Sequence, residues 1–169
     1  MFEPKNDDIA AVEAAHLPWQ HLGSLLINRG LLTVDQVKQA FEEQRLTGKR
    51  LGEIVVAHKW VSSSDLAQAL AEQAGMEYVD LSESEPEHEA ATLLQKELAF
   101  RYQAMPVRFV NDDLLLVAIA DPTDVGVADD LRLALGHNVR LAVSDPGDLE
   151  RAIKKLYRTQ IEVDETVAA

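Results

Sequence analysis

The chain has 169 residues, of which 47% are hydrophobic and 27% are charged, and its formal net charge is −13. This composition is typical of a globular protein with one ordinary core or two small ones, and the negative charge argues against binding of DNA or RNA. The longest strongly apolar stretch, 114–120, is much shorter than the roughly 20 residues of a membrane helix. Since the start, MFEP, lacks signal-peptide features and cysteine is absent, we expect a cytoplasmic protein without membrane insertion.

The chain begins with an acidic, alanine-rich stretch over residues 2–16, which we expect to form a loosely docked helix. Changes in composition along the chain then predict five segments. These are an N-terminal extension (1–19), a tandem-motif helical subdomain (20–76), a linker (77–90), an α+β subdomain (91–158) and a flexible tail (159–169). The MFEP start and the acidic tail favour a free-standing chain over a fragment.

Residues 21–44 and 50–73 are two copies of one pattern. Leu22 and Gly23 recur 29 residues later as Leu51 and Gly52. A duplicated unit of this kind suggests a quasi-symmetric surface, suited to a symmetric partner.

Each copy is predicted to be a helical hairpin. In the first copy Gly30 ends a short helix, and Thr33 with Gln36 forms a capping box that opens the next one. In the second copy Ser62 can cap the second helix, but Lys59 stands in the place of Gly30. A lysine in a left-handed turn costs on the order of 1 kcal/mol, which favours a differently shaped second turn. The four helices predict a compact bundle.

The repeat region is less acidic than the whole chain. Residues 21–60 carry six basic and four acidic side chains, so an anion would be repelled least here. Alternatively, this stretch is simply a solvated helical surface of mixed charge.

The second half mixes helix and strand signals. The predicted elements are a helix at 93–102, strands at 106–110 and 114–120 joined by a turn at 111–113, a helix at 127–135, a strand at 139–143 and a helix at 146–157. The predicted fold class is therefore α+β, with a four-helix bundle of two tandem hairpins followed by a small sandwich whose three-stranded sheet is antiparallel.

The repeated pattern R-L-G, a glycine turn and L-x-x-x-L-x-x-Q, given twice with a five-residue spacer, resembles the MshE-type N-terminal domain of type II secretion and type IV pilus assembly ATPases. The Leu98–Tyr102, Met105–Val107, Leu116–Pro122 and Ala152–Tyr157 segments are similar to the α+β half of that domain. The resemblance covers residues 20–158. It implies a regulatory module that binds cyclic di-GMP, whose twofold symmetry matches the duplication.

The resemblance and the residue chemistry together predict a ligand site in the repeats. Arg50 can bond a phosphate with two N–H groups or stack on a guanine, and glycine lets an anion approach the backbone. The predicted ligand-binding residues are His21, Leu22, Gly23, Val37, Phe41, Gln44, Arg50, Leu51, Gly52, Leu66, Leu70, Gln73 and Asp121.

Most of these residues also have a purely structural explanation. The apolar residues Val37, Phe41, Leu66 and Leu70 are spaced like ordinary helix core. The two glycines would also permit close helix crossing, the glutamines often face solvent at helix ends, and Asp-Pro at 121–122 commonly makes a turn at a strand end.

Two positions depart from the family pattern. His21 stands where the first motif has arginine, so the fixed charge and the two-pronged donor are missing there. Arg29 and Arg45 are the candidates to compensate. Lys59 replaces the second turn glycine, and Trp60 follows it as either a packing residue or a stacking surface.

An enzymatic function is not expected. The sequence has no Walker A loop, no nucleophile elbow and no metal-ligand spacing among its histidines, so we expect neither a cofactor nor a metal. The main hypothesis is a cyclic di-GMP receptor that acts on secretion or pilus assembly proteins through a population shift. The alternatives are an adaptor that docks an assembly ATPase to its inner-membrane platform without nucleotide, and an oligomerisation module.

Overall fold

The computed structural model describes the backbone of residues 18–124 and 126–167, and the side-chain surroundings of residues 22–124 and 126–158. The chain divides into two compact units, Met1–Ala69 and Leu70–Ala169. The helix predicted at 2–16 lies outside the described residues.

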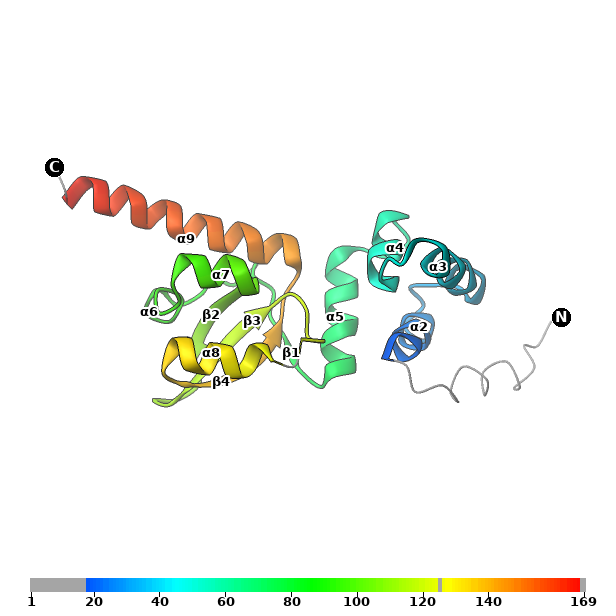
Figure 1. Cartoon of the computed structure of the whole chain (residues 1–169), viewed down its shortest axis with the longest axis horizontal. Coiled ribbons are helices and arrows are strands. Elements are labelled where there is room, and N and C mark those ends of the chain that lie inside the picture. The colour runs from blue at the N-terminus through cyan, green and yellow to red at the C-terminus, as the bar shows by residue number, and fades with distance from the viewer. Residues whose placement is uncertain (1–17, 125, 168–169) are drawn as a thin grey trace. The chain divides into compact units, whose positions relative to one another are not determined.

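The first unit contains the two predicted helical hairpins (Figure 1). Its helices are α2 (Pro18–Asn28), α3 (Val34–Thr47), α4 (Leu51–Ala57) and the first part of α5 (Ser63–Ala74), which continues into the second unit. Leu26, Ile54 and Val55 are fully buried. The four helices are thus found where the sequence predicted them, and their packing as a regular bundle stays a prediction.

Both predicted helix caps are present. The Thr33 hydroxyl accepts a hydrogen bond from the Gln36 backbone N–H at 3.2 Å, and the Gln36 side chain accepts one from the Thr33 backbone N–H at 2.9 Å. In the second copy, the Ser62 hydroxyl accepts from the Asp65 backbone N–H at 3.1 Å. Each cap satisfies N–H groups that the helix itself leaves unpaired.

The turns inside the two hairpins have the same shape. Gly30 has φ +71°, and Lys59, 29 residues later, has φ +60°. In the first turn Leu31 donates to the Leu26 carbonyl at 2.9 Å, and in the second the equivalent Trp60 donates to the Val55 carbonyl at 3.1 Å. The different second turn that the sequence favoured is therefore not observed. The hairpin keeps its left-handed residue although a lysine occupies it.

The second unit is built on a four-stranded sheet (Figure 1). The strands are β1 (Glu77–Tyr78), β2 (Ala104–Phe109), β3 (Leu114–Ile119) and β4 (Asn138–Val143), and the helices after α5 are α6 (His88–Ala91), α7 (Lys96–Tyr102), α8 (Val127–Leu135) and α9 (Pro146–Val167). The strand order is β1-β4-β3-β2.

The prediction of a three-stranded antiparallel sheet is wrong, because the sheet is mixed and has a fourth strand. Only β2 and β3 are antiparallel, whereas β3 with β4 and β4 with β1 are parallel. The segment β3-α8-β4 is a strand-helix-strand unit, in which a helical crossover returns the chain to run parallel. β1 has two residues and lies in the predicted linker, where its length gives almost no periodic signal.

Helices cover both faces of this sheet. In Figure 1, α7 and α9 lie on one side of it and α8 lies on the other. β3 needs both layers, because its residues from Leu115 to Ile119 are all at most 1% exposed. Leu131 of α8 and Ile153 of α9 supply the facing apolar side chains, which are 0% and 2% exposed.

Local polar contacts fix the ends of the strands. The Asn111 side chain accepts from the backbone N–H groups of Asp113 and Leu114 at 3.0 and 2.9 Å, which confirms the predicted turn between β2 and β3. The buried Ser144 hydroxyl donates to the Val79 carbonyl at 2.6 Å and ties β1 to the end of β4. Asp145 then caps α9 by accepting from the Gly147 N–H at 2.8 Å.

Two helix predictions differ from the structure in their limits. The helix expected at 93–102 is shorter, because α7 begins only at Lys96, and α6 is a separate short helix that ends before the predicted range. The tail expected to be flexible from residue 159 is helical as far as Val167, since α9 continues without interruption. The physical reason is that neither glycine nor proline follows Gly147 to break the helix. Among residues 18–124 and 126–167, no helix is long and apolar enough to cross a membrane.

Candidate ligand-binding site in the helical repeat

The two copies of the repeated motif occupy different places in their helices. α2 begins at Pro18, so Gly23 is the sixth residue of α2. In the second copy Arg50 is the N-cap of α4, and Gly52 is the second residue of that helix. Because only the first turn of a helix leaves N–H groups unpaired, only the second motif can offer its backbone to an anion.

Arg50 is exposed and lies at the extended residue before α4. Its backbone has φ −70° and ψ 148°, and its N–H donates to the Glu53 carboxylate at 3.1 Å. Glu53 lies in the first turn of a seven-residue helix, so its negative charge already offsets the small helix dipole. The attraction of this site for an anion therefore rests on the cationic side chain of Arg50 and not on the backbone of α4.

The two motif glycines allow close helix packing. A Cβ atom on Gly23 would lie 3.3 Å from Val37 Cγ1 and 3.4 Å from Phe41 Cζ, and one on Gly52 would lie 2.9 Å from Leu66 Cδ2. Helix packing, the alternative raised for both residues, is thus their observed role. Gly23 is buried, whereas Gly52 is partly exposed and remains accessible from solvent. A ligand contact at Gly52 stays a prediction.

The predicted apolar floor is divided between core and surface. Val37 is 6% exposed and belongs to the core of the first unit, as do Leu22 at 6% and Leu51 at 2%. Phe41, Leu66 and Leu70 are partly exposed, so a ligand could still reach them. Phe41 on α3 and Leu66 on α5 each lie against the glycine of their own copy. Leu70 also lies on α5, where it is the first residue of the second unit.

The remaining predicted residues lie on different elements of the chain. Gln44 is partly buried near the end of α3, and Gln73 is exposed near the end of α5. Asp121 belongs to the second unit, where its carboxylate accepts from the Thr123 backbone N–H at 2.9 Å. The turn role considered for Asp121 is thus observed. The side chain of His21 lies outside the described residues, and its role stays a prediction.

One cluster beside the second turn was not found from the sequence. The His58 ring nitrogen lies 2.6 Å from the Glu43 carboxylate, and the ring stacks on Trp60 at 4.4 Å with an interplanar angle of 12°. Glu43 and His58 are fifteen residues apart on opposite sides of the spacer, so no local periodicity joins them. Trp60 thus packs against a side chain of its own unit, and its role as a stacking surface for a ligand stays a prediction.

Arg45 was a candidate to compensate for the missing first arginine, and it has a partner of its own. Its guanidinium donates to the Glu42 carboxylate at 2.5 Å on the exposed side of α3. This hydrogen bond holds the pKa of the Glu42 carboxyl below its usual value. An exposed pair of this kind contributes little to stability, so Arg45 can still exchange Glu42 for another anion.

Residues 74–163 match the MshEN domain family, which is more than half of the chain. The chain belongs to the MshEN domain family. This finding confirms the resemblance that the repeated motif and the α+β segments indicated.

Three relatives show the context of this MshEN domain. The type IV pilus assembly ATPase PilB of Myxococcus xanthus (strain DK1622) is 31% identical over 136 residues, which are 80% of this chain and 24% of PilB. A structure of MshE with cdg, an abbreviation of cyclic di-GMP, shares 28% sequence identity with this chain and superposes on it with a TM-score of 0.70. The alignment covers 80% of this chain and 98% of the MshE chain. The N-terminal domain of XpsE is 25% identical with a TM-score of 0.62, covering 83% and 96%. The chain thus spans about a quarter of the length of PilB.

The similarity also extends into the helical repeat. The alignment with PilB covers 136 residues of the chain, whereas only 96 residues lie between 74 and the C-terminus. At least 40 of the aligned residues therefore precede the family match. The repeat is part of what this chain shares with the pilus ATPase.

Proposed function

We propose that this MshEN domain binds cyclic di-GMP and regulates type II secretion or type IV pilus machinery without catalysing a reaction. The observation that carries the proposal is the second motif, which presents an exposed Arg50 and a partly exposed Gly52 at the start of α4. The relative whose structure was determined with cdg, MshE, supports the choice of ligand.

The chemistry of the second motif suits a guanine nucleotide. The Arg50 guanidinium can hold a phosphate through two N–H groups or stack on a guanine ring. Partly exposed Phe41 and Leu66 offer apolar surface to a purine. Gln44, which is partly buried, can donate to or accept from a base edge or phosphate.

Regulation would follow from a population shift. A ligand that binds one arrangement of the repeat more tightly than the others increases the population of that arrangement. The shift in the equilibrium is limited by the difference in the ligand's affinity for the arrangements. The partners would be secretion or pilus assembly proteins in the cytoplasm, because PilB, which shares the domain, is a pilus assembly ATPase. No nucleic acid, metal or cofactor is required by this proposal.

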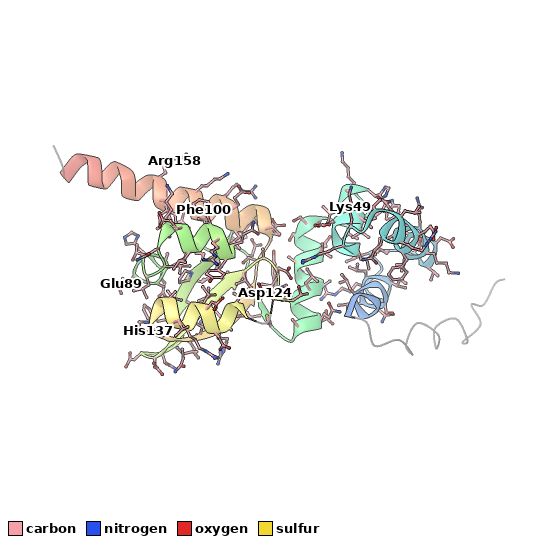
Figure 2. The ribbon with its side chains drawn as sticks, viewed as in Figure 1. Lys49, Glu89, Phe100, Asp124, His137 and Arg158 are labelled. Carbon is pink, nitrogen blue, oxygen red and sulfur yellow. The ribbon has the colours of Figure 1, made fainter. Side chains whose placement is uncertain are left out.

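The test is isothermal titration of the full chain with cyclic di-GMP, beside GTP and ATP. We expect selective binding that weakens at least about tenfold in Arg50→Ala, because one lost charge-assisted pair is worth about 1.5–3 kcal/mol. Lys49→Ala is the matched control, since it removes the same charge one residue away. The Lys49 side chain extends outward from the ribbon in Figure 2.

Two outcomes would contradict the receptor proposal. The first is the absence of heat and of a thermal shift at high ligand concentration. The second is equal weakening in Arg50→Ala and Lys49→Ala, which would indicate general attraction of an anion rather than a built site. Arg50→Lys separates charge from geometry, because lysine keeps the charge and lacks the planar fork.

An adaptor function without nucleotide is the second candidate. It is favoured by the first motif, where histidine replaces arginine at position 21 and Gly23 is buried within α2. In this case the chain would dock an assembly ATPase to its membrane platform equally well with and without cyclic di-GMP. Co-purification with a platform protein in both conditions, unchanged by Arg50→Ala, would support this function over the receptor.

A further inference from the structure

The second unit contains a hollow of about 530 Å³ that belongs to no predicted site. It lies between the first half of α9 and the chain from Leu81 to Ala91. Its volume falls within the range of small-molecule sites, which is roughly 300–1,000 Å³. All its lining residues belong to the unit Leu70–Ala169, so the hollow does not depend on the helical repeat.

The floor of the hollow is apolar and fixed in the core. Met105 of β2 and Ala91 of α6 line it, and each is 2% exposed. Leu156 and Ala152 of α9 pack against the same core and also line it. A planar or aliphatic group can therefore be buried here without losing a hydrogen bond.

Two cations stand at the rim, one helical turn apart on α9. Arg151 and Lys155 both line the hollow, and their side chains are 74% and 71% exposed. They share one face of the helix with Ala152 and Leu156, as the i, i+4 spacing requires. The hollow thus combines an apolar floor with two cations at its edge, each paired with a carboxylate that also lines the hollow.

The acidic partners of these cations can yield to a ligand. Lys155 Nζ lies 2.6 Å from Glu85, and this ammonium lowers the pKa of the Glu85 carboxyl. The Glu85 side chain is 81% exposed, so exchanging it for another anion costs little. Arg151 donates to Asp148, but a guanidinium has five N–H groups and can hold a second acceptor at the same time.

We propose that this hollow binds a small organic phosphate, with the phosphate on Lys155 and Arg151 and the apolar body over Met105 and Leu156. A phosphate dianion competes for Lys155 better than the single carboxylate of Glu85, because it carries more charge and more acceptor oxygens. This site is separate from the cyclic di-GMP site proposed in the repeat, and neither depends on the other.

The test is an NMR titration of the isotopically labelled full chain, in which backbone amide shifts locate the binding. The first probe is phenyl phosphate, which carries both a charged phosphate and an apolar ring. Inorganic phosphate carries the charge alone, and phenol carries the ring alone. We expect saturable shifts with phenyl phosphate around the hollow, at millimolar affinity. Each of the other probes should bind at least about tenfold more weakly, because it lacks half of the interaction.

A matched pair of variants on α9 tests the role of Lys155. Lys155→Gln should weaken phenyl phosphate about tenfold. Lys154→Gln should leave it unchanged, because Lys154 pairs with Glu150 and does not line the hollow. Arg50→Ala should also leave it unchanged, so this test can fail independently of the cyclic di-GMP test. The spectra themselves show whether each variant is folded.

Any of three results would overturn the proposal. Shifts that do not saturate or lie elsewhere would show that the hollow is not a site. Equal weakening in both lysine variants would reduce it to general electrostatic attraction. If inorganic phosphate bound as tightly as phenyl phosphate, the apolar floor would play no part. If phenol did so, the cations would play no part.

Discussion

Lys59→Gly should stabilise the first unit, because Lys59 holds a left-handed backbone with φ +60°. A residue with a side chain in this region costs roughly 1–2 kcal/mol. Glycine avoids that cost but loses more backbone freedom on folding, worth roughly 0.5–1 kcal/mol. The expected net gain is therefore about 0.5–1 kcal/mol, or a rise in melting temperature of about 4 °C for a unit of this size.

The assay is urea unfolding followed by tryptophan fluorescence. Both tryptophans of the chain, Trp19 and Trp60, belong to the unit Met1–Ala69, so the signal reports that unit. The midpoint should rise in Lys59→Gly with an unchanged slope against urea. Lys59→Ala is the matched control and should change little, because alanine keeps the Cβ atom and the same strain.

Gly30→Ala is the reverse experiment in the first copy. A Cβ atom at Gly30 would meet no atom within 4 Å, so the expected loss of about 1 kcal/mol comes from the backbone alone. The reasoning would be refuted if Lys59→Gly and Lys59→Ala had the same midpoint while Gly30→Ala was destabilised. That result would mean that the second turn is not left-handed in solution.

Three further predictions concern the core, the alkaline pH range and the first motif. Leu131→Ala in α8 should cost about 2–5 kcal/mol in urea unfolding, whereas Leu133→Ala, at a side chain 85% exposed, should cost almost nothing; similar losses would contradict the observed burial. Tyr157→Phe should cost about 1–2 kcal/mol, because its hydroxyl donates to the buried Leu94 carbonyl at 2.7 Å. Burial also raises the pKa of Tyr157 from its usual value. The stability that this shift contributes is therefore full below the ordinary tyrosine pKa of about 10 and is lost as the pH rises through the folded-state pKa. The free energy of unfolding should therefore change less between pH about 8 and about 11 in Tyr157→Phe than in the wild type. His21→Arg should raise cyclic di-GMP affinity by less than about tenfold in calorimetry, since the first motif lies inside α2, and a larger gain would show that the first copy is competent.

The elements of this chain were predictable where one local signal decided them. Thr33 and Ser62 begin helices because their hydroxyls cap the first turn, and Asn111 turns the chain between β2 and β3. The parallel pairing of β3 with β4 was also available from the sequence, since a helix stands between the two strands. The two-residue β1 was not, because its place depends on Val79 and Ser144, 65 residues apart.

The candidate site was predictable in its residue types but not in their exposure. The repeat indicated Gly23 and Gly52 together, yet one is buried and the other partly exposed. The cause is the start of α2 at Pro18, which places the first motif inside a helix while Arg50 caps the second. Proline is favoured at the first position of a helix. Pro18 therefore indicated that the first helix begins ahead of the motif, although the repeat alone suggested that both motifs lie at the same place in their helices.

A further departure from symmetry in the second copy lies in its turn. Lys59 keeps the left-handed backbone at an energetic cost, and its two neighbours in the chain, His58 and Trp60, stack on each other. Strained residues persist only where their surroundings hold them, and such positions cluster at functional sites. The strained turn and the exposed Arg50 lie at opposite ends of α4. If the proposed ligand binds Arg50, it contacts the helix that ends at the strained turn. We therefore expect the second copy to be the half of the repeat in which ligand binding is coupled to a change of conformation.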